Sequence, residues 1–375
     1  FCISLTGFLG AILNSFDRFA VPAVTPVLLN LVLIIAAVFV APRMNEPAMA
    51  LAFGVLVAGV LQFSFQLPFV ARLGLLPKPK PVWQDPHVKK VLLLMGPAIF
   101  GVSVSQINLL LDTVLASFLP TGSVSWLYYS DRLTELPLGV FGVGIATVIL
   151  PALSRQHAAS SQQFSVTLNW ALRCILLIAL PATVALVVLA KPILVTLFQY
   201  GQMTVRDVNM ASFSLVAYSL GLTAFMLIKV LASAYFAQQD TKTPVKIGII
   251  AMVSNMLLNF VFVIPMHFYW QLGHAGLALA TVASAFLNAG LLYRGLHKNA
   301  AFTLNNHWRY FLVKLLLASI AMGFCLWFAL QLLPSFVALA WHERLFNTAG
   351  LCFFGLAIYG FVLFIAGIRP WHFKV

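Results

Sequence analysis

Long uncharged runs of apolar residues, each about 20 residues in length, recur along the whole 375-residue chain. A helix rises 1.5 Å per residue, so about 20 apolar residues span the roughly 30 Å hydrocarbon core of a bilayer. A shorter apolar run, 1–14, opens the chain. The other runs predict ten membrane-spanning helices, over 22–42, 47–70, 91–118, 124–153, 171–194, 206–237, 244–264, 274–296, 310–333 and 345–368.

These runs are continuously apolar, without the two-residue alternation that strands of a membrane barrel need. The chain is 62% hydrophobic and 8% charged, far outside the range of soluble domains. We therefore predict an all-α polytopic membrane protein.

The basic residues carry the topology signal. Fifteen of the 22 Lys and Arg residues fall in loops on one predicted face, and only Arg43, Lys191, Arg206 and Arg344 on the other. This bias marks the first face as cytoplasmic, so we expect the loop 71–90 and the C-terminus to be cytoplasmic. It also accounts for the net charge of +13 without nucleic acid as a partner. The four cysteines lack metal or redox spacing.

The polar, Lys- and Pro-rich loop 71–90 divides the chain. We expect a remainder of an N-terminal half at 1–70, a six-helix half at 91–296 and two extra helices at 297–375. "GAILNSFDRFAVPAVTPVLLN" and "ASAYFAQQDTKTPVKIGIIAMVSN" both run through a polar turn with Asp to a Pro that opens a helix. If these are repeat positions, the first half lacks about three and a half helices, and we expect a chain truncated at its N-terminus.

The stretch "VSWLYYSDRLTELPLGVFGVG" places Asp131, Arg132 and Glu135 inside an apolar span. An ionised side chain at bilayer depth costs roughly 2.5–3.5 kcal/mol, so these groups must face protein or water. On a helix Asp131 and Glu135 share a face, and Arg132 reaches Glu135 three residues on, so the carboxylates can hold the guanidinium. The cluster lines a wet cavity, or it is a neutralised clamp between helices.

Three segments resemble the MurJ (MviN) lipid II flippase family, within the MATE-like (MOP) exporter superfamily. They are "GAILNSFDRFAVPAVTPVLLN", "MGPAIFGVSVSQINLLLDTVLASFLPTGSVSWLYYSDRLTELPLGVFGVGIATVILPALS" and "QQDTKTPVK". The second is the most specific, because MATE drug exporters do not share its SVSQ and YY-x-DRL wording. The resemblance implies fourteen helices, as two six-helix halves plus two C-terminal helices.

The resemblance also implies a function. Such a protein would flip the undecaprenyl-diphosphate-linked muropeptide precursor across the bacterial inner membrane by alternating access, for peptidoglycan and cell-wall synthesis. Arg132 matches a functionally required arginine of the family's central cavity. A guanidinium suits a diphosphate because its planar fork makes bidentate hydrogen bonds and keeps its charge. We expect no catalytic residue; membrane lipids and the cell-wall synthesis machinery are the other expected partners.

A cation site is a second expectation. Asp112, Asn255, Asn259 and Thr281 lie at similar depths on three predicted helices. Carboxylate, amide and hydroxyl oxygens form a hard ligand set suited to Na⁺. Some family members bind sodium on these helices, but with a second carboxylate where this chain has Asn259. Na⁺ is therefore a candidate coupling ion. A proton carried by Asp112 is the alternative coupling ion. The alternative without a bound ion is that these side chains only make hydrogen bonds between helices.

Other signals are open. Lys229 could snorkel or line the cavity. Ser103 and Gln106 could face the cavity or make helix contacts. Pro137 could be a bending point or a static kink. Four tryptophans at span ends indicate an interfacial belt: Trp126, Trp270, Trp308 and Trp341.

The number and position of the acidic residues help to choose between rival functions, and the chain has nine of them. An intramembrane polyprenyl-diphosphate enzyme would use Asp131 and Glu135 as catalytic or metal-binding groups, but no acid-rich loop, P-loop or paired metal motif accompanies them. A flippase for another polyprenyl-linked oligosaccharide, or a MATE-type exporter, is the nearer alternative. A drug exporter of cations would be expected to expose acids without the arginine.

Overall fold

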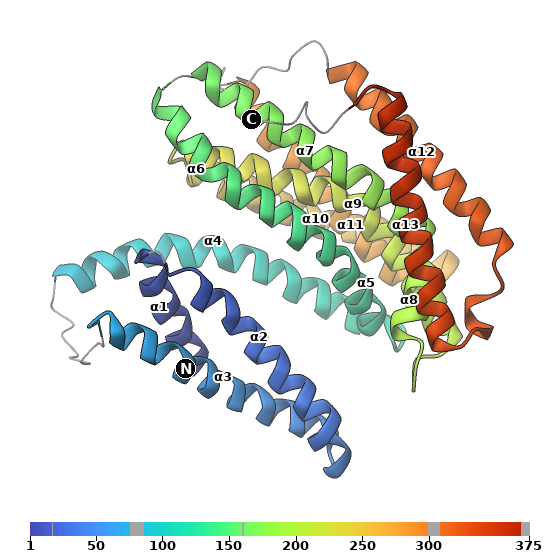
Figure 1. The fold of residues 1–375 in the computed structure, drawn as a ribbon, viewed down its shortest axis with the longest axis horizontal. Helices are drawn as coiled ribbons and strands as arrows, with labels where there is room; N and C mark the ends of the chain where they lie inside the picture. The colour runs from blue at the N-terminus through green and yellow to red at the C-terminus, as the bar shows by residue number, and fades with distance from the viewer. Residues whose placement is uncertain (17, 76–85, 160, 299–307, 369–375) are drawn as a thin grey trace. The chain divides into compact units, whose positions relative to one another are not determined.

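In a computed structural model, the chain is described over residues 1–16, 18–75, 86–159, 161–298 and 308–368 (Figure 1). Every regular element in these ranges is a helix. Nine continuous helical segments in these ranges, two of them composed of several elements, are long and apolar enough to cross a membrane. This confirms the all-α polytopic class. The helix α4 (Pro86–Ser117) covers the expected span 91–118 but is not among the nine, so the count of ten stays a prediction.

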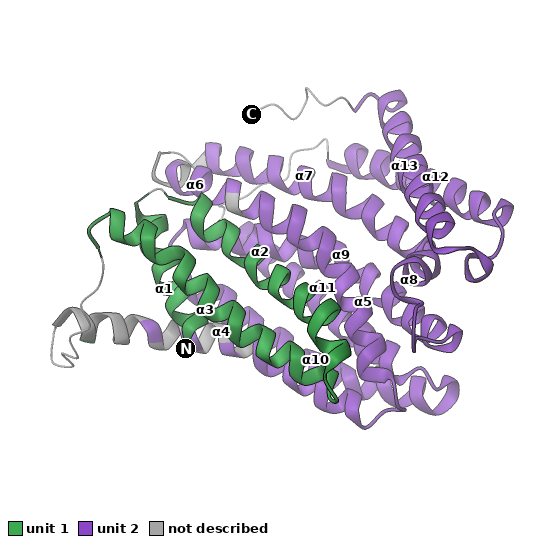
Figure 2. Cartoon of the chain, turned by 60° about the horizontal axis from the view of Figure 1, so that its bottom comes forward, with its two compact units in different colours: residues 1–92 green, residues 93–375 purple. Residues whose placement is uncertain are grey.

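Two compact units divide the chain, Phe1–Leu92 and Leu93–Val375 (Figure 2). Much of the expected linker lies outside the described residues, at 76–85, and so does the end of the chain, at 369–375. The assignment of the units to halves of a repeat stays a prediction.

Unit 1 contains three helices around a small core. They are α1 (Cys2–Ser15), α2 (Ala20–Ile35) and α3 (Pro47–Arg72), with a π-helical turn η1 (Ala36–Val40) and a 3-10 turn η2 (Ala41–Arg43) extending α2. Leu9, Leu13 and Val70 form the apolar core. The Gln62 amide donates to the Thr25 carbonyl at 2.9 Å, and Gln66 donates to the Thr25 hydroxyl at 2.9 Å. Interhelical hydrogen bonds of this kind hold α2 to α3 where apolar contacts with lipid and protein are similar in energy.

Unit 2 contains α4 from Leu93 onward and the helices that follow it. They are α5 (Ser123–Pro137), a π-helical turn η3 (Leu138–Val143), α6 (Gly144–Ala159), α7 (Ser161–Val188), α8 (Ala190–Phe198), α9 (Val205–Ala237), α10 (Lys242–Trp270), α11 (Gly273–Lys298), α12 (Trp308–Leu332), a 3-10 turn η4 (Phe336–Ala338) and α13 (Trp341–Ile365). The helix α9 packs on α5, α6, α7, α8 and α11. It is therefore the central helix of the unit.

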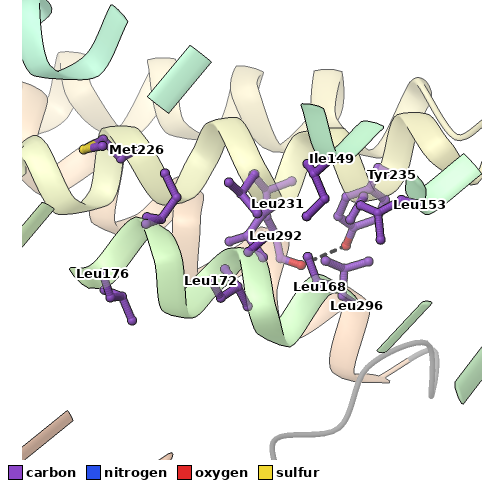
Figure 3. Close-up of a cluster of buried hydrophobic side chains, with 14 of the residues drawn as sticks. Ile149, Leu153, Leu168, Leu172, Leu176, Met226, Leu231, Tyr235, Leu292 and Leu296 are labelled. Carbon is purple, nitrogen blue, oxygen red and sulfur yellow. Dashed lines mark hydrogen bonds between the residues drawn. The ribbon is translucent and has the colours of Figure 1, made fainter. Parts of the chain in front are cut away.

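The core of unit 2 is drawn in Figure 3, where side chains of α6, α7, α9 and α11 interdigitate. Its one drawn hydrogen bond runs from the Tyr235 hydroxyl to the Leu292 carbonyl, at 2.9 Å. Small residues allow the helices to approach closely. A Cβ on Gly276 would lie 2.9 Å from the Phe262 carbonyl oxygen, so α10 and α11 are in backbone contact there.

Most expected spans agree with the observed helices to within about six residues at each end, but 171–194 is wrong at both ends, because the observed helix begins at Ser161 and stops at Val188. The helix α7 ends there, Leu189 leaves the helix, and the separate helix α8 follows. Pro192 explains the break, because it has no N–H for the Val188 carbonyl and its ring would clash with that oxygen.

A π-helical turn interrupts the expected span 124–153. Pro137 ends α5, and the wider turn η3 follows directly over Leu138–Val143 before the chain continues as α6. A proline cannot donate to the carbonyl four residues before it, and a π-bulge is one way a helix absorbs that loss. The span is therefore interrupted at Pro137, two residues beyond Glu135 of the charged cluster.

Candidate functional site

One face of α5 is fixed to α9. The Trp126 indole N–H donates to Asp207 Oδ1 at 2.9 Å, and the Ser130 hydroxyl lies 2.8 Å from the Ala211 carbonyl oxygen. Trp126 is 5% exposed and Ser130 is fully buried. Together with buried Thr134 these contacts set the rotation of α5 about its axis. The other face of α5, which carries the charged cluster, must then point away from α9's packing surface.

Two of the four tryptophans expected in an interfacial belt are instead buried. Trp126 packs edge-on against His274, with ring centroids 4.9 Å apart. Trp308 is 7% exposed and donates to Asn169 Oδ1 at 2.7 Å. A buried indole needs an acceptor for its N–H, and both have one. Trp270 and Trp341 are exposed, and their place in an interfacial belt stays a prediction.

The charged cluster lies on the free face of α5. The Arg132 guanidinium makes an ion pair with Glu135, and the Arg132 and Glu135 side chains are 52% and 51% exposed. The Arg132 Cζ also lies 5.0 Å from the centroid of the Tyr128 ring. Asp131 is half-buried, and within the described ranges the Arg132 ion pair is made to Glu135, not to Asp131. Of the two carboxylates expected to hold the guanidinium, Glu135 therefore does so.

A cavity of about 480 Å³ opens beside this face, within unit 2. It is formed by α4, α5, η3, α9 and α11. Its polar lining consists of Asn108, Asp112, Thr113, Tyr128, Asp131, Arg132, Thr134, Glu135, Tyr218 and Thr281. The wall thus carries one guanidinium and three carboxylates. The charged cluster lines this cavity together with two residues of the predicted cation site, Asp112 and Thr281.

The predicted cation residues come together around Asp112. The Asn259 amide nitrogen donates to Asp112 Oδ1 at 3.0 Å, and the Thr281 hydroxyl donates to Asp112 Oδ2 at 3.4 Å. The Asn255 amide suits its surroundings when its nitrogen faces Asp112 Oδ1, at 3.2 Å, and its oxygen accepts from the Thr281 backbone N–H, at 3.1 Å. Asn255 and Asn259 are 1% and 2% exposed. The four side chains from three helices therefore form one buried polar network.

One atom of this network fits the expected ion. Asn259 Oδ1 is buried and has no hydrogen-bond donor within the described part of the chain. A buried amide oxygen without a partner carries a desolvation cost, and an amide oxygen is a ligand of the kind that a small hard cation takes. The oxygen types present are those of the expected Na⁺ site, and the site itself stays a prediction. No group of three or more His, Cys, Asp and Glu side chains suited to a metal occurs in the described residues.

Three of the residues expected at the substrate site do not line the cavity. Ser103 is half-buried and Gln106 exposed, both on α4, and Lys229 is exposed on α9. Their assignment to a substrate site stays a prediction.

The structure adds cavity residues that the sequence reasoning missed. Tyr128 lies one helical turn before Arg132, and Asn108 lies one turn before Asp112 and donates to its Oδ2 at 3.4 Å. A search for side chains four residues from each charge would have found both. Tyr218 enters from α9, and nothing local in the sequence signals it.

Comparisons with known proteins agree on one family. The family model of the lipid II flippase MurJ matches residues 1–346. A probable lipid II flippase MurJ of Vibrio cholerae is 49% identical over 368 residues, covering 98% of this chain and 69% of that protein. The lipid II flippase MurJ of Burkholderia cenocepacia is 39% identical over 378 residues, covering 99% and 72%. A solved structure of a lipid II flippase MurJ in an inward closed conformation has a TM-score of 0.79 at 27% identity, covering 97% of this chain and 71% of that one.

Proposed function

The chain belongs to the MurJ family of lipid II flippases, and on that premise we propose that Arg132 binds the diphosphate of lipid II during its passage across the bacterial inner membrane. The observation that carries this proposal is a guanidinium in the wall of a cavity, within a membrane-spanning helix. Arg132 is nine residues from the start of α5 at Ser123, or about 14 Å along the helix. An arginine at that depth is retained for a ligand or a partner.

The guanidinium is suited to a ligand that must be both bound and released. Glu135 occupies Arg132 in this structure, so an arriving diphosphate exchanges with a carboxylate. The arginine exchanges one charge-assisted hydrogen-bond partner for another and is never left uncompensated in the membrane. Asp131 and Glu135 oppose a permanent phosphate complex, because like charges in one cavity repel. Moderate affinity of this kind permits alternating access, in which the site opens to each side of the membrane in turn.

The Asp112 network is the proposed coupling site. Asp112, Asn255, Asn259 and Thr281 would hold Na⁺, which would supply a positive charge in the same cavity as Arg132. A second positive charge there favours the diphosphate, so ion and substrate would bind with positive coupling. A proton on Asp112 would act in the same direction by removing a negative charge.

The cargo and the reaction type follow from the family. A lipid II flippase moves its substrate without changing a covalent bond, and no catalytic residue is proposed. A flippase of another polyprenyl-linked oligosaccharide would share the diphosphate, and so would use Arg132 in the same way. The polyprenyl chain would lie in the surrounding bilayer, and the cell-wall synthesis machinery would receive the flipped precursor.

The test is growth of bacteria depleted of their own lipid II flippase and supplied with the protein in its full coding length. We expect the wild type to support growth, and the Arg132→Ala variant, at equal expression, to fail. Arg206→Ala is the matched control, because Arg206 is an exposed arginine on α9 that does not line the cavity. Growth with Arg132→Ala would contradict the role of Arg132, and failure of both variants would indicate a general loss of folding.

A further inference from the structure

Arg132 is held from two directions on one helix face. Tyr128, Arg132 and Glu135 occupy positions i, i+4 and i+7 of α5, which lie on the same side of the helix. The Tyr128 ring lies under the guanidinium, with 5.0 Å between Cζ and the ring centroid, while Glu135 pairs with the NH1 group. All three side chains line the cavity.

The two contacts use different parts of the guanidinium. Glu135 accepts a hydrogen bond from its N–H edge, which is the same edge that makes bidentate bonds to phosphate. Tyr128 contacts the guanidinium through the face of its own ring, in a cation–π interaction that takes up no N–H donor. A bound phosphate must therefore displace Glu135, whereas Tyr128 can keep its contact throughout.

Packing explains little of the position of Tyr128, whose ring contacts within the described residues are with Arg132 and, at 6.0 Å between ring centroids, with Tyr129. It is 57% exposed, with its ring on the cavity side of α5. The neighbouring Tyr129 is the packing residue, since its ring lies 4.7 Å from that of Phe198 on α8. A half-exposed arginine side chain loses rotamer freedom when it binds a ligand, and this loss of entropy weakens binding. Contact with the Tyr128 ring restricts the side chain before the ligand arrives, so less entropy is lost in the binding step.

We propose that Tyr128 is a positioning residue, whose ring holds the Arg132 guanidinium in place with its N–H edge free while the lipid-linked diphosphate replaces Glu135. This inference rests on the proposed function of Arg132. It gives the two neighbours opposite effects: the ring favours phosphate binding, and Glu135 competes with it.

The test is a titration of the purified full-length protein in detergent micelles with lipid II, comparing dissociation constants. Tyr128→Leu should weaken binding about two- to five-fold, the value of an exposed cation–π contact. Tyr128→Phe keeps the ring and should bind like the wild type. Glu135→Gln should bind more tightly than the wild type, because the competitor has lost its charge.

A double substitution separates positioning from direct contact with the substrate. In an Arg132→Ala background, Tyr128→Leu should cause no further loss, because its effect passes through the arginine. A loss of equal size in both backgrounds would overturn the proposal in favour of a direct contact. Tyr200→Leu is the matched control: it removes the ring that lies 5.8 Å from the Arg344 Cζ, outside the cavity, and should leave lipid II binding unchanged.

The outcomes also separate this inference from the function on which it rests. If Arg132→Ala weakens binding and Tyr128→Leu does not, the positioning role is wrong and the substrate site stands. If Arg132→Ala itself binds like the wild type, the proposed site is wrong. A loss in Tyr128→Phe as large as in Tyr128→Leu would assign the effect to the hydroxyl and overturn the stacking role.

Discussion

The hydrogen bond from Trp126 to Asp207 allows a quantitative prediction about how α5 is held. Replacing Trp126 by Phe keeps an aromatic ring against His274 but removes the N–H that donates to Asp207 Oδ1 at 2.9 Å. A hydrogen bond to a charged acceptor contributes about 1.5–3 kcal/mol. The other oxygen, Oδ2, still accepts from the Thr204 N–H at 2.9 Å and from its hydroxyl at 2.6 Å, so the carboxylate is not left without partners. We therefore expect the lower end, about 1.5 kcal/mol.

A double-mutant cycle measures this interaction directly. The variants are Trp126→Phe, Asp207→Ala and both together, with the free energy of unfolding measured by SDS titration in mixed micelles. Asp207→Ala also removes the capping box with Thr204, but that cost appears in both arms and cancels. A coupling energy near 1.5 kcal/mol supports the anchor. A coupling below about 0.3 kcal/mol, within the scatter of additive pairs, would refute the reasoning.

Three further predictions address packing, ion binding and pH. Gly276→Leu should lower the thermal stability and the yield of folded protein, because the new Cβ would meet the Phe262 carbonyl oxygen at 2.9 Å. Gly290→Leu is the control and should lower neither, because no atom lies within 4 Å of its Cβ position. Equal stability of the two variants would contradict the packing of α10 on α11. If Asp112 binds Na⁺, sodium should raise the melting temperature of the wild type over that in potassium, and Asp112→Asn should abolish the difference; a sodium effect that survives Asp112→Asn would exclude this site. Burial raises the pKa of Asp240, but hydrogen bonds from Thr243 and from the Lys242 backbone lower it by more, so the pKa lies below its usual value. The stabilisation that goes with a lowered pKa is present above the unfolded pKa of about 4 and is lost as the pH falls through the folded pKa. The stability advantage of the wild type over Asp240→Asn should therefore disappear in acid. An advantage that persists at pH 2 would contradict this.

The helices were predictable because the membrane imposes one length and one composition on every span. The environment of the charged side chains was predictable for the same reason: a carboxylate or guanidinium within an apolar span must face protein or water, not lipid. Equal depth was enough to bring Asp112, Asn255, Asn259 and Thr281 to one location, since antiparallel neighbours share a coordinate along the membrane normal. These four lie in one network in the structure.

What the sequence could not predict is the rotation of each helix about its axis. In a bilayer, lipid-facing and protein-facing surfaces are both apolar, so periodicity does not identify the packed face. Trp126 and Asp207 are 81 residues apart, and nothing local pairs them. For Ser103, Gln106 and Lys229 the sequence left a cavity position and other roles open, because depth in the membrane does not say which way a side chain points. Polar contacts between helices carry that information, and they become visible only in three dimensions.

The most direct test of the central claim, that the charge of Arg132 binds the lipid-linked diphosphate, changes the charge at that one position. Arg132→Cys is made in a protein whose native cysteines are replaced by alanine (Cys2, Cys174, Cys325 and Cys352). The new thiol, exposed to the cavity like the arginine it replaces, is then modified with an aminoethyl or a sulfonatoethyl methanethiosulfonate. We predict that lipid II binding is weak in the unmodified variant, is partly restored by the cationic group and is not restored by the anionic one. Equal binding after both modifications, or wild-type binding without either, would contradict the account.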